Sequence, residues 1–377
     1  MAKKITDKIT QDKLSGKIYQ IFDITRRESN FITLLAILTF ICGVVSPYPQ
    51  VAMWFGFMLA AYSAIANDSI QTIGTFIASN QQRKWWILWL FIGLIFVATV
   101  TYSFIVFDGD VSFQRLDSKG FSEAPTSFTF LQLSAPLILL ILTRMRMPVS
   151  TTFLLLNAFA TDAGAIWNVM EKSFMGYVIA FITAIIVWFL VGAFVKQYFK
   201  GKPSRYWDVA QWIISGCLWS VWIQQDAANI AIFLPRSLNM AQFLAFTLFI
   251  FLGLGLLFYL KGDKIQEIVS EKSGVADVRA ATIVDLIYAI LLFYFKAIST
   301  IPMSTTWVFI GLLGGREIAI SMTKKRHKKR ARSLKNSVKM AGKDMGYATI
   351  GLVVSLLLAI AINPNIREEV LAFLFGR

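Results

Sequence analysis

Two apolar stretches of the chain each carry an aspartate beside amide side chains. They read "AYSAIANDSIQTIGT" at 61–75 and "SVWIQQDAANIAIF" at 220–233. A carboxylate at membrane depth is costly unless it faces a cavity, pairs with a cation or takes up a proton. Carboxylate, amide and hydroxyl oxygens suit hard cations such as Na⁺, and a carboxylate can equally carry a proton. The alternative is two structural aspartates hydrogen-bonded between helices. A Na⁺ or H⁺ site is predicted at Asn67, Asp68, Thr72, Asp226 and Asn229, with Asp68 and Asp226 as the metal ligands.

A hydroxyl-rich motif also occurs twice, as Pro-x-Ser-Thr-Thr at 148–152 and 302–306. Proline is preorganised for the first helical position, and Ser or Thr there satisfies free backbone N–H groups. A half-helix that begins inside the membrane would present N–H groups, the positive end of its dipole and hydroxyls to an anion. The competing interpretation of each triplet alone is a cap or a kink in an ordinary transmembrane helix. Finding both favours an oxyanion site.

These motifs lie in a chain that is too apolar for a water-soluble fold. It has 377 residues, is 56% hydrophobic and has a mean hydropathy of +0.61, which is more than a soluble core could bury. A membrane span needs about 20 apolar residues. We expect an all-α polytopic membrane protein with about 11 transmembrane helices, at 31–47, 51–79, 85–107, 127–143, 147–169, 174–195, 207–235, 238–260, 280–298, 302–322 and 346–362.

Positive charge predicts the orientation of these spans, because short loops rich in Lys and Arg stay on the cytoplasmic side during insertion. With a cytoplasmic N-terminus, the inner segments hold 29 of the 37 Lys and Arg residues. The net charge of +15 and the basic run at 323–343 therefore need no nucleic acid as a partner. We expect a multi-pass protein of the cell (inner) membrane, surrounded by the lipid bilayer, with a cytoplasmic lead at residues 1–30.

The two motifs recur in the same order, and the charge-derived topology places the copies in opposite directions. The span of Asp68 runs inward and that of Asp226 outward, whereas the span after Pro148 leaves the cytoplasm and that after Pro302 enters it. Such inverted repeats are typical of secondary transporters, with a midplane binding site between discontinuous helices. We expect a first inverted repeat at 31–195, a second at 196–322, a basic cytoplasmic loop at 323–345 and a final transmembrane helix and tail at 346–377.

The order "ANDSIQTIGTFIAS", "PVSTT", "QQDAANIAI", "PMSTT" resembles the inorganic phosphate transporter (PiT) family, as a divergent member. That family has two inverted halves, each with an Asn-Asp-containing motif and a Pro-Val-Ser-Thr-Thr-like motif. The resemblance implies that the aspartates and amides bind coupling cations and help to hold the anion, while the Ser-Thr-Thr turns cradle phosphate. The implied substrate-binding residues are Asn67, Gln71, Ser150, Thr151, Thr152, Gln225, Asn229, Ser304, Thr305 and Thr306.

The sequence also departs from the family's motifs. Gln71 and Gln225 replace asparagines, Ile232 stands where the second motif has glycine, and Phe153 and Trp307 follow the Ser-Thr-Thr turns. Longer amides and a lost glycine change the size of a cavity and the approach of the backbone. Two alternatives therefore stay open beside phosphate: a symporter of sulfate or another small oxyanion, and a non-transporting membrane protein that uses its basic loop for docking.

The resemblance implies a secondary active symporter of inorganic phosphate, with Na⁺ or H⁺ as the coupling ion and no cofactor. An enzyme is not expected, because the sequence has no nucleophile–base pair, no His or Cys metal spacing and no phosphate-cradling glycine loop. A homodimer is an open alternative for its assembly. A further hypothesis is an ion pair between Asp162 and Arg316, each fourteen residues after its repeat's proline.

Overall fold

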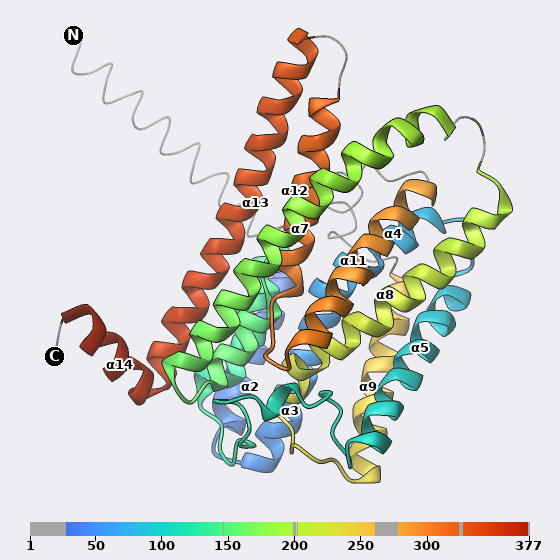
Figure 1. Cartoon of the computed structure of the whole chain (residues 1–377). Coiled ribbons are helices and arrows are strands. Elements are labelled where there is room, and N and C mark those ends of the chain that lie inside the picture. Colours follow the sequence, from blue (N-terminus) through green and yellow to red (C-terminus); the bar gives the residue numbers. More distant parts are fainter. Residues whose placement is uncertain are drawn as a thin grey trace, which may run out of the picture.

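Long helices form the chain, as Figure 1 shows for a computed structural model that describes residues 28–145, 147–198, 201, 203–260, 278–323 and 327–375. In these ranges every regular element is a helix. Most of the lead expected at 1–30 lies outside the described residues. The elements are α2 (Ser29–Val45), α3 (Pro49–Ala64), η1 (Ile65–Ser69), α4 (Ile70–Ser79), α5 (Trp85–Val106), η2 (Arg115–Asp117), α6 (Phe130–Arg144), η3 (Thr152–Leu156), η4 (Asn157–Phe159), α7 (Ala163–Tyr198), α8 (Arg205–Ala231), α9 (Met240–Tyr259), α11 (Val278–Ile298), α12 (Thr305–Met322), α13 (His327–Ile362) and α14 (Pro364–Phe375).

Six of the described helices are long and apolar enough to cross a membrane, and α2 and α6 are apolar but shorter. The chain is therefore an all-α polytopic membrane protein. Each predicted span corresponds to one or two helices except 147–169, which is wrong. There the chain forms only a short helical segment at 151–159, and α7 begins at Ala163. The break has a local cause, because Asp162 Oδ1 accepts a hydrogen bond from Ala165 N at 2.9 Å and so starts a new helix.

The connections between helices gather at two opposite ends of the bundle (Figure 1). At one end, Leu238 N in the connection before α9 donates to Gly109 O in the connection after α5, at 2.9 Å. At the other end, Asn80 Nδ2 after α4 donates to Gln211 Oε1 near the start of α8, at 3.1 Å. We call the first the outer end and the second the inner end, after the orientation that the charge distribution predicts.

Both hydroxyl motifs interrupt the helices in the same way but in opposite directions. α6 runs away from the outer connection at 107–127, residues 147–150 turn back without regular structure, and segment 151–159 returns to the outer end, where Thr161 N donates to Gly120 O at 3.2 Å. After α11 has run to the outer end, residues 299–304 turn back and α12 proceeds to the inner end (Figure 1). The two copies are thus discontinuous and inverted, as their sequence order and charge predict.

The helix that follows the second hydroxyl motif packs backbone to backbone against α7. A Cβ added to Gly311 would lie 2.4 Å from Tyr177 O, and one added to Gly315 would lie 2.2 Å from Phe181 O. Only glycine permits so close an approach, and its spacing of four residues places both glycines on one face of α12. The α12 helix is therefore fixed to α7 along the part that follows the motif.

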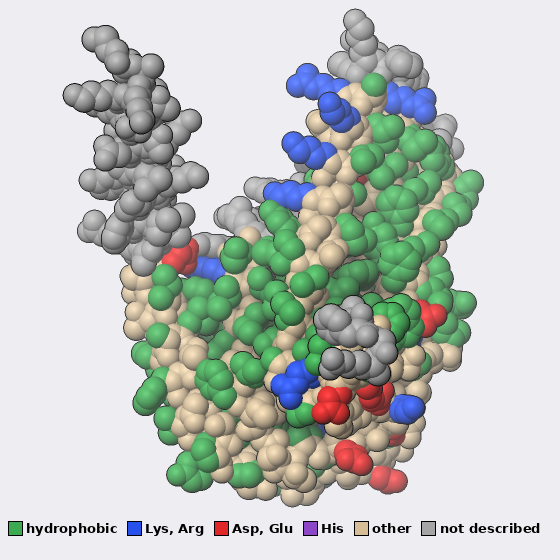
Figure 2. All heavy atoms as spheres, turned by 90° about the vertical axis from the view of Figure 1, so that its left-hand side faces the viewer, with side chains coloured by type: hydrophobic (Ala, Val, Ile, Leu, Met, Phe, Trp, Pro, Cys, Tyr) green, Lys and Arg blue, Asp and Glu red, His purple; other side chains and the backbone are tan. Residues whose placement is uncertain are grey.

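The basic segment expected as a loop at 323–345 is helical from His327 onward, because α13 continues through it. Its Lys, Arg, Ala and Met residues are good helix formers, so high charge here does not mean a loop. Ser321 Oγ of α12 lies 2.9 Å from Ser333 Oγ and 2.8 Å from Ser337 Oγ of α13. Figure 2 shows Lys and Arg side chains one above another along this projecting end. The positive charge therefore lies on a helix joined to α12.

Candidate functional site

The predicted motifs meet in the interior of the bundle. Asp68 lies on η1, a single π-helical turn between α3 and α4, whereas Asp226 lies within α8, which runs without a break. π turns inside helices occur frequently at functional sites. Both aspartates are buried, with 1% and 2% of their surface exposed. The starts of segment 151–159 and of α12 reach these carboxylates from the two repeats.

The carboxylate of Asp68 accepts hydrogen bonds from both hydroxyl motifs. Thr151 Oγ1 donates to Oδ2, and Thr306 Oγ1 donates to Oδ1 at 3.3 Å. Asn67 Nδ2 also donates to Oδ1 at 2.7 Å, and to the carbonyl oxygen of Val149 at 2.7 Å. We call Asn67-Asp68-x-x-Gln71 the first acid motif and Gln225-Asp226-x-x-Asn229 the second acid motif. The Asp68 carboxylate therefore connects the first acid motif with the hydroxyl motif of each repeat.

The carboxylate of Asp226 has fewer donors. Asn229 Nδ2 donates to its Oδ1 at 2.6 Å, and to the hydroxyls of Thr151 and Thr152 at 3.1 Å. The hydroxyls of Thr152 and Thr305 lie beside the carboxylate, but no hydrogen bond of normal geometry reaches Oδ2 from the described residues. Asp226 therefore keeps a buried oxygen without a donor.

Each aspartate contacts one threonine from each repeat, and the pattern is symmetric. Each hydroxyl motif has a first threonine, Thr151 or Thr305, and a second threonine, Thr152 or Thr306. Asp68 contacts the first threonine of its own repeat and the second threonine of the other repeat, and the same holds for the aspartate of the second repeat. A pseudo-twofold axis thus passes between the two carboxylates, as inverted repeats require.

The two serines of the hydroxyl motifs act as caps for the segments that follow them. Ser150 Oγ accepts a hydrogen bond from Phe153 N, and Ser304 Oγ accepts one from Trp307 N, both at 3.2 Å. Such a bond satisfies one of the free N–H groups at the start of a helix. The serines therefore shape the turns from which the threonines project, and the threonine hydroxyls are the ones that contact the carboxylates.

The remaining predicted residues lie around this cluster. Gln225 Nε2 donates to Leu292 O at 2.9 Å. Thr72 Oγ1 donates at 3.1 Å to the backbone oxygen of Asp68, one turn earlier. Gln71 lies on α4, but its side chain is outside the described part of the molecule.

Buried acceptors without donors gather in the second acid motif. Within this motif they are Gln225 Oε1, Asp226 Oδ2 and Asn229 Oδ1, each without a hydrogen-bond partner among the described residues. A buried polar atom without a partner costs about 1–3 kcal/mol, so this cluster favours a cation or a proton donor as its occupant. Amide and carboxylate oxygens suit Na⁺, and Asp226 can alternatively take up a proton. The donor set therefore fits either of the two predicted coupling ions.

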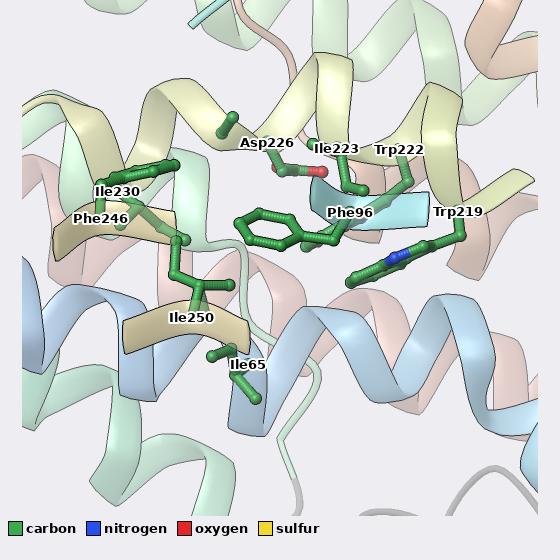
Figure 3. Close-up of a pocket in the computed structure, with 11 residues that line it drawn as sticks. Ile65, Phe96, Trp219, Trp222, Ile223, Asp226, Ile230, Phe246 and Ile250 are labelled. Atoms are coloured by element: carbon green, nitrogen blue, oxygen red, sulfur yellow. The ribbon is translucent and has the colours of Figure 1, made fainter. Parts of the chain in front are cut away.

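A cavity next to Asp226 is lined almost entirely by apolar side chains. Its volume is about 20 Å³, which is room for about one water molecule. Figure 3 shows Asp226 among Phe96, Trp219 and Trp222, and no threonine of the hydroxyl motifs belongs to the lining. This cavity is too small and too apolar for an oxyanion, so the anion has to be sought on the threonine side of the carboxylate.

A third buried aspartate lies between the cluster and the inner end. Asp285 accepts hydrogen bonds from Thr75 Oγ1 and Ser215 Oγ, both at 2.7 Å. Each of its oxygens thus has a hydroxyl donor, in contrast to Asp226. We regard it as a satisfied link between α4, α8 and α11.

Two buried cations that sequence reasoning missed lie close to the site. Arg115 Nε on η2 donates at 2.9 Å to the backbone oxygen of Gln224, next to the second acid motif. Lys172 Nζ on α7 donates at 3.1 Å to Ser299 O, shortly before the second hydroxyl motif. The sequence does carry a signal for them. Both lie outside the predicted inner segments, so the preference of positive charge for the cytoplasmic side does not explain their presence.

The hypothesised ion pair between Asp162 and Arg316 is not formed. Arg316 Nη1 pairs with Glu317 Oε1 at 2.7 Å, and its guanidinium lies over the ring of Trp188 at 5.0 Å. Asp162 instead accepts from Ala165 N at the start of α7. Because the two motifs run in opposite directions, equivalent positions after each proline lie toward opposite ends of the bundle.

No family model matches the chain, and no curated protein matches it. Among solved structures, a protein titled "The sodium-dependent phosphate transporter" is similar over 82% of this chain and 98% of its own chain, with 17% sequence identity and a TM-score of 0.49.

Proposed function

We propose that the chain is a secondary active symporter that moves inorganic phosphate together with Na⁺ or H⁺. The observation that carries this proposal is that two buried aspartates contact threonines of both inverted repeats where two helices are broken. A site shared between two repeats is taken apart when one repeat moves against the other. Its contents can then be released to one side or the other, which is alternating access.

The aspartates are the proposed carriers of the coupling ion. The oxygens of Asp68, Asp226 and the neighbouring amides Asn67 and Asn229 supply the donor set, and the unpaired acceptors of the second acid motif mark where positive charge is most needed. If the ion is H⁺, Asp226 is the stronger candidate for protonation, because its buried Oδ2 has no hydrogen-bond donor among the described residues to stabilise a negative charge.

The threonine hydroxyls are the proposed ligands of the anion. A hydroxyl can rotate and has one proton to donate. With an ionised carboxylate beside it, the proton points at the carboxylate, as in Thr151 and Thr306 with Asp68. Once a cation satisfies that carboxylate, the hydroxyl is free to donate to an oxyanion instead.

This change of hydrogen-bond partner, from the carboxylate to the oxyanion, couples anion binding to cation binding. Two ionised carboxylates repel an anion placed among them, so the anion binds well only after cations or protons have reduced that charge. By linkage, bound anion then raises the affinity for the cation by the same factor. Neither ion crosses efficiently alone, which is the requirement for symport.

Uptake of labelled phosphate into proteoliposomes tests the proposal. We expect uptake that requires an inward Na⁺ gradient or an inward proton gradient, and comparison of the two gradients identifies the ion. Uptake that excess sulfate suppresses more strongly than excess unlabelled phosphate would reassign the substrate to sulfate. A folded protein that takes up neither anion under any gradient would contradict transport and would leave docking through the basic part of α13 as the remaining alternative.

A further inference from the structure

Two cations share the same backbone acceptors just before the second hydroxyl motif. Arg115 Nη1 donates to the carbonyl oxygens of Ser299, Thr300 and Ile301 at 3.3–3.4 Å. Lys172 Nζ donates to those of Ser299 and Ile301. Because both nitrogens bind the same two oxygens, they lie within the length of two hydrogen bonds of each other.

These cations are buried, and in the described part of the chain neither forms a direct ion pair with a carboxylate. Arg115 is 2% exposed and Lys172 is 8% exposed, and the ion pairs found there involve other residues. Like charges at this range repel strongly in a medium of low dielectric constant, and carbonyl dipoles offset only part of that repulsion. An anion between the two cations would remove the repulsion.

Each cation also has N–H groups that its described hydrogen bonds do not use. A guanidinium has five N–H donors and an ammonium has three. The described contacts of Arg115 use Nε and Nη1 and leave Nη2 without a partner, and those of Lys172 use two of its three N–H groups. Donors from two converging cations match the several oxygens of a tetrahedral oxyanion.

The pair lies between the outer end and the aspartate–threonine cluster. Arg115 comes from the outer connection at 107–127, contacts α8 one residue before the second acid motif, and interacts electrostatically with Asp226. Lys296, half-buried at the outer end of α11, interacts electrostatically with Arg115, and its Nζ lies 5.6 Å from the ring centroid of Phe113. Positive charge thus extends from the outer end to the cluster.

We propose that Arg115 and Lys172 form a second anion site, which captures the oxyanion on the outer side before it passes to the threonines. This inference rests on the proposed function, because it assigns the first binding site that the same substrate reaches. An oxyanion bound there competes with the carbonyl oxygens of residues 299–301 for the two cations. It thereby loosens the segment that leads into the second hydroxyl motif and links arrival of the anion to movement of that motif.

The test compares Arg115→Gln and Lys172→Gln with Arg236→Gln in the full-length chain. Arg236 is a matched control, because its guanidinium also binds only carbonyl oxygens in the outer connections, and its electrostatic partners are Asp110 and Asp117. Arg115→Lys keeps the charge and serves as the conservative variant. Thermal stabilisation by inorganic phosphate is measured at fixed Na⁺ and fixed pH, and stabilisation by Na⁺ is then measured in the absence of phosphate.

We expect Arg115→Gln and Lys172→Gln to raise the half-saturating phosphate concentration about tenfold or more, since each loses a charge-assisted hydrogen bond. The half-saturating Na⁺ concentration should stay within about twofold, Arg115→Lys should recover part of the loss, and Arg236→Gln should resemble the unmodified chain.

Unchanged phosphate binding in folded Lys172→Gln overturns the inference, and so does an equal shift in Arg236→Gln. If Arg115→Gln does not fold, Lys172→Gln and Arg115→Lys decide the outcome. An unmodified chain that binds no oxyanion and takes none up contradicts the proposed function as well.

Discussion

The rings of Phe153 and Trp307 pack edge to face, with centroids 5.5 Å apart and planes at 87°. Each ring belongs to the residue whose backbone N–H donates to the serine three positions earlier. The two residues occupy equivalent positions in the inverted repeats, so the contact crosses the pseudo-twofold axis. It holds the starts of the two broken helical segments against each other, directly beside the threonines that face the carboxylates.

The serine caps predict a loss of stability rather than a loss of ligand affinity. Ser150→Ala and Ser304→Ala should each destabilise the fold by about 1 kcal/mol, the usual cost of removing an N-cap hydroxyl. Thermal unfolding in detergent measures the change. Thr129→Ala, which removes the cap of α6 at the outer end, is the control and should behave similarly. An unchanged melting temperature together with a tenfold weaker phosphate response would instead identify the serine hydroxyl as a direct ligand.

The hydrogen bonds to Asp68 predict that the threonines affect both ions. Thr306→Val keeps the shape of the side chain but removes the donor that the second repeat supplies to this carboxylate. A hydrogen bond to a charged group is worth about 1.5–3 kcal/mol, so the half-saturating phosphate concentration should rise about tenfold or more. The dependence on Na⁺ or H⁺ should change with it.

Thr306→Ser provides the matched control for that variant. It restores the hydroxyl, so phosphate uptake and its cation dependence should return toward those of the unmodified chain. Equal impairment of the serine and valine variants would mean that the methyl group, and not the hydroxyl, is what the site requires.

Much of the site could be predicted because its chemistry is visible in the side chains. Asp68 and Asp226 stand out in apolar runs, and the doubled hydroxyl motif identifies their partners. Arg115 could not be found in this way, because its partners are backbone oxygens 109 to 186 residues away. Every residue has such an oxygen, so the sequence carries no complementary side chain to recognise.

The errors in the predicted elements have a related cause. Residues 154–156 are leucines that are equally apolar in a full span and in a short segment, so hydropathy does not locate the end of the segment. The polar turn that includes Asp162 is what ends it. Conversely, the basic run after His327 is polar enough to be assigned to a loop, although its residues favour a helix and α13 continues through them.

Neutralising Asp226 should uncouple the two ions. In Asp226→Asn the site has lost one negative charge, so we expect phosphate to stabilise the protein even without Na⁺ and at alkaline pH. Gradient-driven uptake should be lost, because the variant has one carrier of the coupling ion fewer. Binding and uptake assays at several Na⁺ concentrations and pH values measure both effects.

The comparison variant for this prediction is Asp285→Asn. Both oxygens of Asp285 already accept from hydroxyls, so the amide should reduce stability while cation-dependent phosphate binding persists. If Asp285→Asn abolished the cation dependence and Asp226→Asn left it intact, the assignment of the coupling site to the second acid motif would be wrong.

The close contact between α7 and α12 predicts that Gly315 tolerates no side chain. In Gly315→Ala the new Cβ would lie 2.2 Å from Phe181 O, so the helices have to separate, at a cost of about 1–3 kcal/mol for overpacking. The same Cβ at Gly346 on α13 would meet nothing within 4 Å, and Gly346→Ala should raise stability by about 0.5–1 kcal/mol through helix propensity. Thermal unfolding of the two variants should therefore shift in opposite directions.

Since α12 begins with the second hydroxyl motif, Gly315→Ala should also weaken the phosphate response, whereas Gly346→Ala should leave it unchanged. Equal stability of the two variants would contradict the backbone contact that fixes α12 to α7.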